Sequence, residues 1–246
     1  MKKILFWPYQ LYVWLVFVPL LVILTFLFST LTVISAALIN PHFASRVFGA
    51  TWARVCGWIT PMIVTVEGAE HARNDRSYVV ASNHQSMYDI FVIYGWLRLD
   101  MKWVMKAELR KVPFMGIGCE KAGHIFVNRR NPKQASEAIN KALAWLGDGI
   151  GILFFPEGTR STDGNLLPFK KGAFHTAIDQ QIPILPVTVS GTKEILPNKT
   201  LALFPGRATM TIHPAIETTG LTLDDMESLK QKTRESIASA LPGDLS

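Results

Sequence analysis

The chain has 246 residues, a formal net charge of +6 and a mean hydropathy of +0.22, a length that accommodates one sizeable core with an appendage. Its two cysteines, Cys56 and Cys119, are too few for a disulfide framework. Residues 1–66 carry four basic and no acidic side chains while the rest has 21 basic and 19 acidic ones, so the charge does not indicate a nucleic-acid partner.

The first predicted element is an apolar stretch at residues 11–39. Its 29 residues exceed the roughly 20 that are needed to span a bilayer. It is also longer than the apolar core of a signal peptide, which has about 7–15 residues. A second apolar stretch, residues 47–66, is expected to lie along the membrane surface with Arg46 and Arg54 reaching lipid headgroups. We therefore expect residues 1–66 to form a membrane-embedded and interfacial helical region, with one or two passes.

From residue 67 the sequence alternates between strand-like and helix-like segments, which indicates one α/β domain over 67–246. Asn131 and Pro132 are typical of a helix start, and the apolar stripe that follows supports a helix there. Residues 124–155 thus form a strand, helix, strand unit, which implies parallel strands. Strands are predicted at 77–81, 101–105, 124–127, 151–155, 184–190 and 208–213, and further helices at 171–180 and 224–241. The fold class is α/β, with a mixed or mostly parallel sheet flanked by helices.

Basic residues are concentrated between positions 98 and 133. They are expected to form either a solvated surface or a face that attracts anionic lipid or a phosphorylated acyl carrier. The group comprises Arg98, Lys102, Lys106, Arg110, Lys111, Lys121, Arg129, Arg130 and Lys133.

The motif N-H-Q-S-M-Y-D at 83–89 follows a predicted strand. If a helix begins near Ser86, Asp89 lies in its first turns and can bond the imidazole of His84. A carboxylate on one ring nitrogen fixes the tautomer and makes the other nitrogen a better base for an alcohol proton. The alternative is a structural histidine at a helix start. Ser86 is more simply a helix cap than a nucleophile, because the chain has no G-x-S-x-G motif.

The motif F-P-E-G-T-R-S at 155–161 follows another predicted strand. Gly158 permits a tight turn, and the guanidinium of Arg160 matches phosphate oxygens in a bidentate manner. Glu157 is expected to brace Arg160 or the turn. Lys106, after the strand 101–105, is a second candidate for binding phosphate. The alternative for both cations is a solvated surface position. Together the two motifs indicate a transferase that acts on a phosphorylated alcohol.

The six histidines show no close metal-ligand spacing, so we expect no metal.

Four motifs in chain order resemble those of the glycerolipid acyltransferase family, and most closely its 1-acyl-sn-glycerol-3-phosphate acyltransferases. The similar segments are N-H-Q-S-M-Y-D at 83–89, K-A-E-L-R-K-V-P-F-M-G at 106–116, F-P-E-G-T-R-S at 155–161 followed by F-K-K-G at 169–172, and I-P-I-L-P-V at 182–187. One departure is Asn128-Arg129, where many members of the family carry Asp-Arg.

The resemblance implies transfer of a fatty acyl group from acyl-CoA or acyl-carrier protein to the 2-hydroxyl of lysophosphatidate, giving phosphatidate. In that interpretation His84 is the general base and Asp89 orients it. Arg160, Lys106 and the turn of Glu157, Gly158 and Thr159 hold the acceptor phosphate. No cofactor is expected beyond the thioester co-substrate. The protein is expected at a membrane, the inner membrane if bacterial, with its catalytic domain facing the cytoplasm.

Other hypotheses remain open at this point. One is the same chemistry on another lysolipid. A second is a lipid hydrolase that uses Ser86 with His84 and Asp89, and a third is a lipid-binding protein without catalysis.

Overall fold

The structure, a computed structural model, describes residues 3–128, 131–146 and 149–242, which form an α/β fold around one sheet. In these residues the sheet has seven strands in the order β1-β7-β6-β2-β5-β3-β4. Neighbouring strands are parallel except for β6 and β7. The strands are β1 (Met62–Glu67), β2 (Tyr78–Ser82), β3 (Asp100–Lys106), β4 (Ile125–Val127), β5 (Ile150–Phe154), β6 (Ile184–Ser190) and β7 (Gly206–Ile212).

Helices precede the sheet in the chain and then alternate with its strands. The α-helices are α1 (Lys3–Tyr12), α2 (Val18–Leu38), α3 (Pro41–Ala44), α4 (Ala50–Ile59), α5 (Tyr88–Trp96), α6 (Met115–Lys121), α7 (Pro132–Leu146), α8 (Gly172–Gln180), α9 (Thr192–Ile195) and α10 (Met226–Ser239). Shorter helical segments are η1 (Val13–Phe17), η2 (Ser45–Gly49), η3 (Ala69–His71), η4 (Ala107–Lys111) and η5 (Leu223–Asp225).

Both faces of the central strands are covered, which is why those strands are apolar throughout. Successive side chains of a strand point to opposite faces. Val80 accordingly joins the cluster that contains Val92 and Ile93 of α5, whereas Val79 joins the cluster formed with α8 and α10. A third cluster packs α7 against β4 and β5. The predicted α/β class with a mostly parallel sheet is confirmed.

The strand β1 was not expected from the sequence. The sequence places residues 62–66 in the membrane-surface stretch, but β1 pairs in parallel with β7 at the edge of the sheet. Ile63 and Thr65 are exposed while Met62 is buried, so the apolar run is an edge strand with one covered face. Pairing with a partner about 140 residues away in the chain cannot be inferred from a local pattern.

The predicted unit over residues 124–155 is confirmed, with one difference in its pairing. Helix α7 starts at Pro132, and the side chain of Asn131 accepts a hydrogen bond from the backbone N–H of Gln134 at 3.2 Å. The strands β4 and β5 are parallel, as expected, but they are not neighbours, because β3 lies between them.

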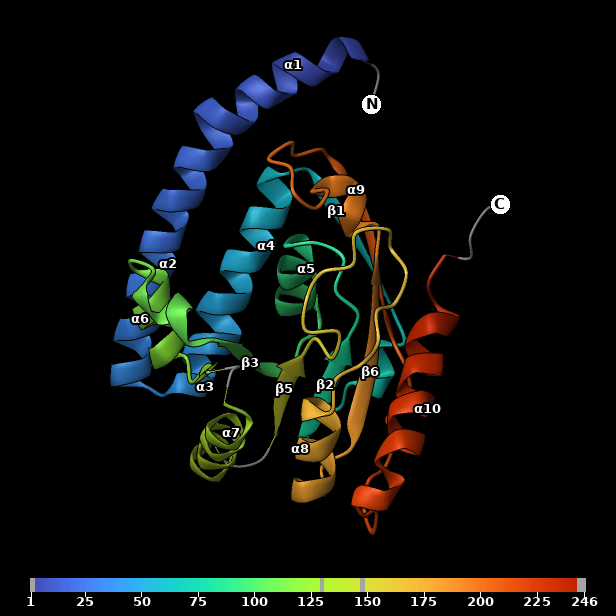
Figure 1. Cartoon of the computed structure of the whole chain (residues 1–246). Helices are drawn as coiled ribbons and strands as arrows, with labels where there is room; N and C mark the ends of the chain where they lie inside the picture. The colour runs from blue at the N-terminus through green and yellow to red at the C-terminus, as the bar shows by residue number, and fades with distance from the viewer. Residues whose placement is uncertain (1–2, 129–130, 147–148, 243–246) are drawn as a thin grey trace.

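One helix in the described residues, Phe6–Leu38, is long and apolar enough to cross a membrane. It runs along the outside of the molecule past α4 (Figure 1). Near its start, Tyr9 Oη donates to the carbonyl of Thr60 at 2.9 Å and Gln10 Nε2 to that of Leu203 at 2.7 Å. Nearer its end, Ser29 Oγ donates to the carbonyl of Phe114 at 2.5 Å. The helix is therefore attached to the same α/β domain at widely separated points.

Two basic side chains that were expected at the surface bind within the protein instead. Arg54 Nε donates to the carbonyl of Gly95 at 2.5 Å and so joins α4 to α5. Lys102 is fully buried, and its Nζ lies 2.9 Å from Asp100 Oδ1 and 2.9 Å from the carbonyl of Ala122. Asp100 Oδ2 also lies 2.5 Å from Nδ1 of His42 in α3. The Lys102–Asp100–His42 cluster thus joins the N-terminal helices to the sheet, and burial lowers the pKa of Lys102.

Candidate active site

Four neighbouring strands bring the sequence motifs together at one edge of the sheet. β6, β2, β5 and β3 are adjacent and parallel, so their carboxyl ends lie at the same edge. His84 follows β2, Glu157 follows β5, Lys106 ends β3 and Thr192 follows β6. Open α/β sheets bind their ligands beyond the carboxyl ends of the parallel strands.

His84 and Asp89 form a hydrogen-bonded pair. Asp89 Oδ2 accepts from His84 Nδ1 at 2.7 Å and from the backbone N–H groups of Gln85 at 2.7 Å and Ser86 at 2.9 Å. Asp89 lies in the first turn of α5 and is fully buried. Since the carboxylate accepts from Nδ1, the neutral ring carries its proton there and Nε2 is left as an acceptor.

Thr192 completes the hydrogen bonding of Asp89, and the sequence analysis did not identify it. Its hydroxyl donates to Asp89 Oδ1 at 2.5 Å, and the side chain is fully buried at the start of α9. A usable signal existed, because Thr192 follows the predicted strand 184–190 at the edge where His84 lies. With Thr192 in place, both oxygens of the buried carboxylate have partners.

The imidazole of His84 is also held by its ring face. Phe155 stacks on it with the ring centroids 3.9 Å apart and the planes inclined by 13°. The side chain of His84 is 14% exposed. Among the residues that the structure describes, no hydrogen bond is made to its Nε2. The ring is therefore fixed in orientation and has one nitrogen available to a ligand.

Glu157 connects the two motifs. Its Oε1 accepts from the backbone N–H of His84 at 2.7 Å, and its Oε2 from that of Leu167 at 2.8 Å. The side chain is 2% exposed, and burial raises its pKa against the opposing effect of these hydrogen bonds. Of the two expected roles, a brace of Arg160 is not seen, since no hydrogen bond between Glu157 and Arg160 occurs in the described residues. The bond from Leu167 agrees with the other expected role, support of the turn, and Glu157 also fixes the backbone of His84.

The turn that carries Arg160 lies directly beside His84. The backbone N–H of Ser161 donates to the carbonyl of His84 at 2.8 Å. Gly158 has φ +72°, and the ammonium group of Lys170 lies 2.5 Å from where a Cβ at this position would be. A side chain at 158 would therefore be strained by its backbone conformation, and the flexible Lys170 side chain would have to move aside. Thr159 and Arg160 are exposed.

Among the residues that the structure describes, Arg160, Lys170 and Lys106 are exposed basic side chains at this edge. Lys170 belongs to the F-K-K-G motif, and its position beside the Gly158 turn makes it a further candidate for binding an anion. Arg129, next to the unusual Asn128, lies outside the described residues.

Ser86 is turned away from the pair. It is fully buried, its Oγ donates to the carbonyl of Leu196 at 2.8 Å and accepts from the backbone N–H of Tyr88 at 3.2 Å. These contacts hold the segment directly before α5, whose N-cap residue is Met87 rather than Ser86.

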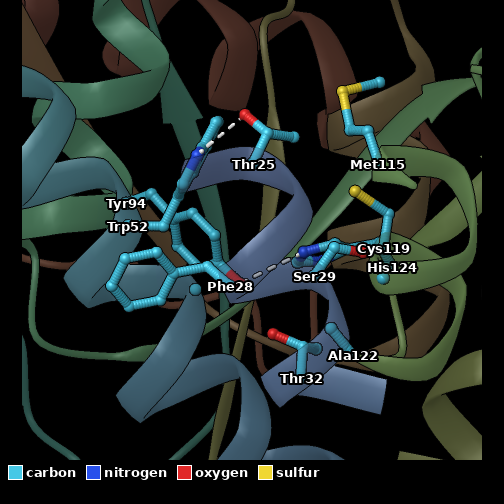
Figure 2. A pocket seen from close by; sticks show the side chains of 12 residues that line it. Thr25, Phe28, Ser29, Thr32, Trp52, Tyr94, Met115, Cys119, Ala122 and His124 are labelled. Atoms are coloured by element: carbon cyan, nitrogen blue, oxygen red, sulfur yellow. Dashed lines mark hydrogen bonds between the residues drawn. The ribbon is translucent and has the colours of Figure 1, made fainter. Parts of the chain in front are cut away.

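An apolar cavity of about 70 Å³ lies between α2, α4, α5 and α6. Figure 2 shows Trp52, Tyr94, Met115, Cys119 and His124 around it. Burial lowers the pKa of His124 to about 3, so this ring is neutral at pH 7.

A series of aromatic ring contacts connects Tyr94, which lines the cavity, to His84. Tyr94 contacts Trp103 with centroids 5.6 Å apart, and Trp103 contacts Phe155 at 6.2 Å. Phe155 in turn stacks on His84. The cavity therefore lies on the side of the aromatic residues away from the His84–Asp89 pair.

A candidate base at the end of one strand and a cationic turn at the end of the next are the features expected of a group transferase for an anionic substrate. The sequence profile described as Acyltransferase matches residues 63–190, about half of the chain. The chain belongs to this acyltransferase family.

Named relatives agree with this assignment. The chain is 36% identical over 176 residues to the 1-acyl-sn-glycerol-3-phosphate acyltransferase alpha of Mus musculus. The aligned segment covers 71% of this chain and 62% of the relative. It is 31% identical over 207 residues to a 1-acyl-sn-glycerol-3-phosphate acyltransferase of Chlamydomonas reinhardtii, covering 83% of this chain and 59% of the relative. The match thus spans about three fifths of each relative's length.

A solved structure extends the similarity to nearly the whole fold. The 1-acyl-sn-glycerophosphate (LPA) acyltransferase PlsC from Thermotoga maritima superposes with a TM-score of 0.77 at 25% sequence identity. The superposition covers 98% of this chain and 97% of the other, so it includes the N-terminal helices.

Proposed function

We propose that this protein transfers a fatty acyl group from an acyl thioester to the 2-hydroxyl of lysophosphatidate, giving phosphatidate. The observation that carries the proposal is the His84–Asp89 pair held by Glu157 and Ser161 beside the turn of Gly158 and Arg160. The names of the relatives specify lysophosphatidate as their acceptor class. The thioester carries the activated acyl group, so the proposed transfer needs no further cofactor.

In the proposed mechanism His84 is the general base. Its Nε2 accepts the proton of the acceptor hydroxyl as the oxygen attacks the thioester carbonyl. The tetrahedral intermediate collapses with cleavage of the C–S bond, and the imidazolium returns the proton to the departing thiolate. Asp89 keeps the ring in the required tautomer and stabilises the imidazolium, because its two oxygens are fixed by His84, Thr192 and two backbone N–H groups.

We assign binding of the acceptor phosphate to Arg160, Lys106 and the turn of Glu157, Gly158 and Thr159. Arg160 and Thr159 contribute side chains, Gly158 permits the turn, and Glu157 orients it from within. The exposed ammonium of Lys170 supports the same role. Cations on the strand ends next to the base would place the 2-hydroxyl near Nε2 once the phosphate is bound.

The Arg160→Lys variant is expected to raise the KM for lysophosphatidate roughly 10- to 100-fold. Lysine keeps the charge but loses the planar fork, and one charge-assisted hydrogen bond contributes about 1.5–3 kcal/mol. Steady-state kinetics with each substrate varied in turn measures the effect. Arg73→Lys is the matched control, because Arg73 is an exposed arginine that precedes β2, at the opposite edge of the sheet. An equal rise in the donor KM would contradict the assignment of Arg160 to the acceptor.

The Ser86→Ala variant is expected to retain most of the activity. The Ser86 hydroxyl is engaged with Leu196 and Tyr88, and in direct attack by the acceptor it needs only to stabilise the start of α5. Loss of such a contact lowers the free energy of unfolding by about 0.5–2 kcal/mol. Thermal unfolding and turnover measured on the same preparation separate the two effects. Loss of turnover together with an acyl-enzyme trapped at Ser86 would instead support a hydrolase that uses this serine.

For the acyl chain we propose the apolar cavity and its continuation along the membrane-facing helices. Its exposed lining is almost entirely apolar, and one lining residue, Tyr94, is linked to His84 through ring contacts of Trp103 and Phe155. The acyl donor is proposed to be acyl-CoA or acyl-carrier protein. Both are water-soluble thioesters of the cytoplasm, so we place the catalytic domain on the cytoplasmic side, at the inner membrane if the source is bacterial.

Membrane association is proposed to rest on the helix Phe6–Leu38. Large apolar side chains along it are exposed, among them Leu11, Leu15, Val22 and Ile23. The helix is bonded to the α/β domain near both ends, through Gln10 and Ser29. A helix that crosses the bilayer could not keep both contacts with a domain on one side. We therefore propose that it lies within one leaflet, with its exposed face in lipid.

A thiol-release assay with a panel of lysolipids and both donors tests the proposed function. Thiol release that depends on lysophosphatidate, with phosphatidate as product, is the expected result. Preference for a different lysolipid would establish the same chemistry on another acceptor. Free fatty acid formed without any lysolipid would indicate a hydrolase, and binding without thiol release a lipid-binding protein.

A further inference from the structure

The segment formed by η4 and α6, residues 107–121, exposes an unusual amount of apolar surface. Its large apolar side chains Leu109, Val112, Phe114 and Ile117 are all exposed in part, from 36% for Leu109 to 52% for Ile117. Four such residues within nine positions form a continuous feature of the kind that marks an interaction surface. We call these four side chains the apolar ridge.

The apolar ridge is continuous with the exposed face of α2. The rings of Phe114 and Phe26 are in edge contact with centroids 4.8 Å apart. Ser29 Oγ donates to the carbonyl of Phe114, and a Cβ at Gly118 would lie 2.4 Å from that same Oγ, so α6 packs closely on α2. Figure 1 shows α6 lying against α2 on the outer side of the molecule. Val22, Ile23 and Leu27 of α2 are exposed next to Phe26.

Phe114 is held in a strained conformation that projects its side chain. Its φ is +61°, a value that bulky residues rarely adopt. Strain of this kind persists only where the surroundings enforce it, and it is concentrated at functional sites. Here the bond from Ser29 to the Phe114 carbonyl and the bond from Gly116 N–H to the carbonyl of Val112, 2.9 Å long, hold the backbone.

Basic side chains lie beside the apolar ridge. Residues 106–121 contain four basic and two acidic residues. Arg110 is paired with Glu120 at 2.8 Å, whereas Lys111 and Lys121 are exposed. Apolar side chains flanked by lysines match the chemistry of a bilayer surface that carries anionic headgroups. Lys106, at the start of this run, is also a candidate ligand of the acceptor phosphate.

We infer that the apolar ridge inserts into the same membrane leaflet as α2 and forms a second membrane contact, made by the catalytic domain itself. The inference rests on the proposed membrane association. With the ridge in lipid, Lys106 lies at the level of the headgroups, so a lysophosphatidate in the leaflet meets the phosphate site without leaving the membrane. The occupant of this surface is a bilayer that contains anionic lipid.

Fluorophore labelling of single cysteines in the full chain tests this inference. The background carries Cys56→Ala and Cys119→Ala, which remove both native thiols. An environment-sensitive NBD label is placed in turn at Ile117→Cys, at Ile23→Cys of α2 and at Leu223→Cys. Leu223 is the matched control, since it is an exposed leucine, 56% accessible, that precedes α10. The protein is reconstituted in vesicles of phosphatidylcholine with phosphatidylglycerol, with or without doxyl-labelled lipid as the quencher.

The expected result is quenching by doxyl lipid at positions 117 and 23 and none at 223. Quenching at 23 without quenching at 117 would overturn the inference while leaving the proposed membrane association standing. Absence of quenching at both 23 and 117 would overturn the membrane association together with the inference. Neither result depends on the identity of the reaction.

A kinetic comparison gives a second test. Ile117→Asn is expected to raise the KM for long-chain lysophosphatidate in vesicles about tenfold while leaving that for a short-chain, water-soluble lysophosphatidate unchanged. Leu223→Asn should change neither value. An equal loss of activity toward both acceptors would show that Ile117 acts through the fold and would contradict the membrane contact.

Discussion

Replacing His84 by alanine is expected to lower kcat for acyl transfer by about 10²–10⁴-fold, with the fold and the membrane association intact. The ring lies at the surface of the site, and the Asp89 carboxylate retains three other donors from Gln85, Ser86 and Thr192. Stability should therefore change little. Turnover is measured on purified protein whose thermal unfolding matches that of the wild type.

His175→Ala provides the matched control, because His175 is an exposed histidine of α8 and should be silent. Asp89→Asn should also reduce kcat strongly. In asparagine, one of the two oxygens of Asp89 is replaced by an NH₂ group. This group would face N–H or O–H donors that now donate to a carboxylate oxygen. Normal turnover of the folded His84→Ala variant would contradict the assignment of His84 as the general base, whatever the result for Asp89→Asn.

The second large effect is expected for Glu157→Gln, although the two side chains have nearly the same shape. Both carboxylate oxygens of Glu157 accept from backbone N–H groups, those of His84 and Leu167. In glutamine one of these oxygens becomes an NH₂ group that faces an N–H donor. One buried backbone donor then loses its partner, which destabilises the protein by about 1–3 kcal/mol. The turn must shift against His84, and a displacement of about 1 Å can reduce the rate 10²-fold.

The kinetic signature distinguishes this role from the one expected from the sequence. A residue that fixes the backbone of His84 should affect mainly kcat, whereas a brace of Arg160 should affect mainly the acceptor KM. Glu137→Gln, an exposed position on α7, is the control for the same chemical change. An unchanged kcat with a raised acceptor KM would restore the original interpretation of Glu157.

The elements and motifs that the sequence predicted are those with a local signal. The strand before His84 is a short β-branched run, and Asn131-Pro132 marks the start of α7. The H-x₄-D spacing required only that a helix start near Ser86, which it does at Tyr88. The proximity of the motifs then followed from the parallel strands, whose carboxyl ends share one edge.

What the sequence did not predict depends on partners far away in the chain. Thr192 follows a predicted strand, but its contact with Asp89 depends on β6 lying beside β2. Lys102 belongs to a stretch rich in basic residues, and its burial depends on Asp100, His42 and the carbonyl of Ala122. The role of Glu157 required the positions of two backbone N–H groups, one 73 residues earlier. Side-chain charge alone carries no information about such contacts.

The pairing of β1 with β7 also sets an order of assembly during synthesis. The first strand of the sheet leaves the ribosome directly after the apolar helices, and its partner follows about 140 residues later. At roughly 5–20 residues per second that delay is about 7–28 seconds. β6, which precedes Thr192, is likewise made late. Under the proposed membrane association, the apolar helices can therefore reach lipid while the edge of the sheet that carries His84 is still incomplete. The nascent chain would then be anchored first and would complete its proposed active site only after its last strands arrive.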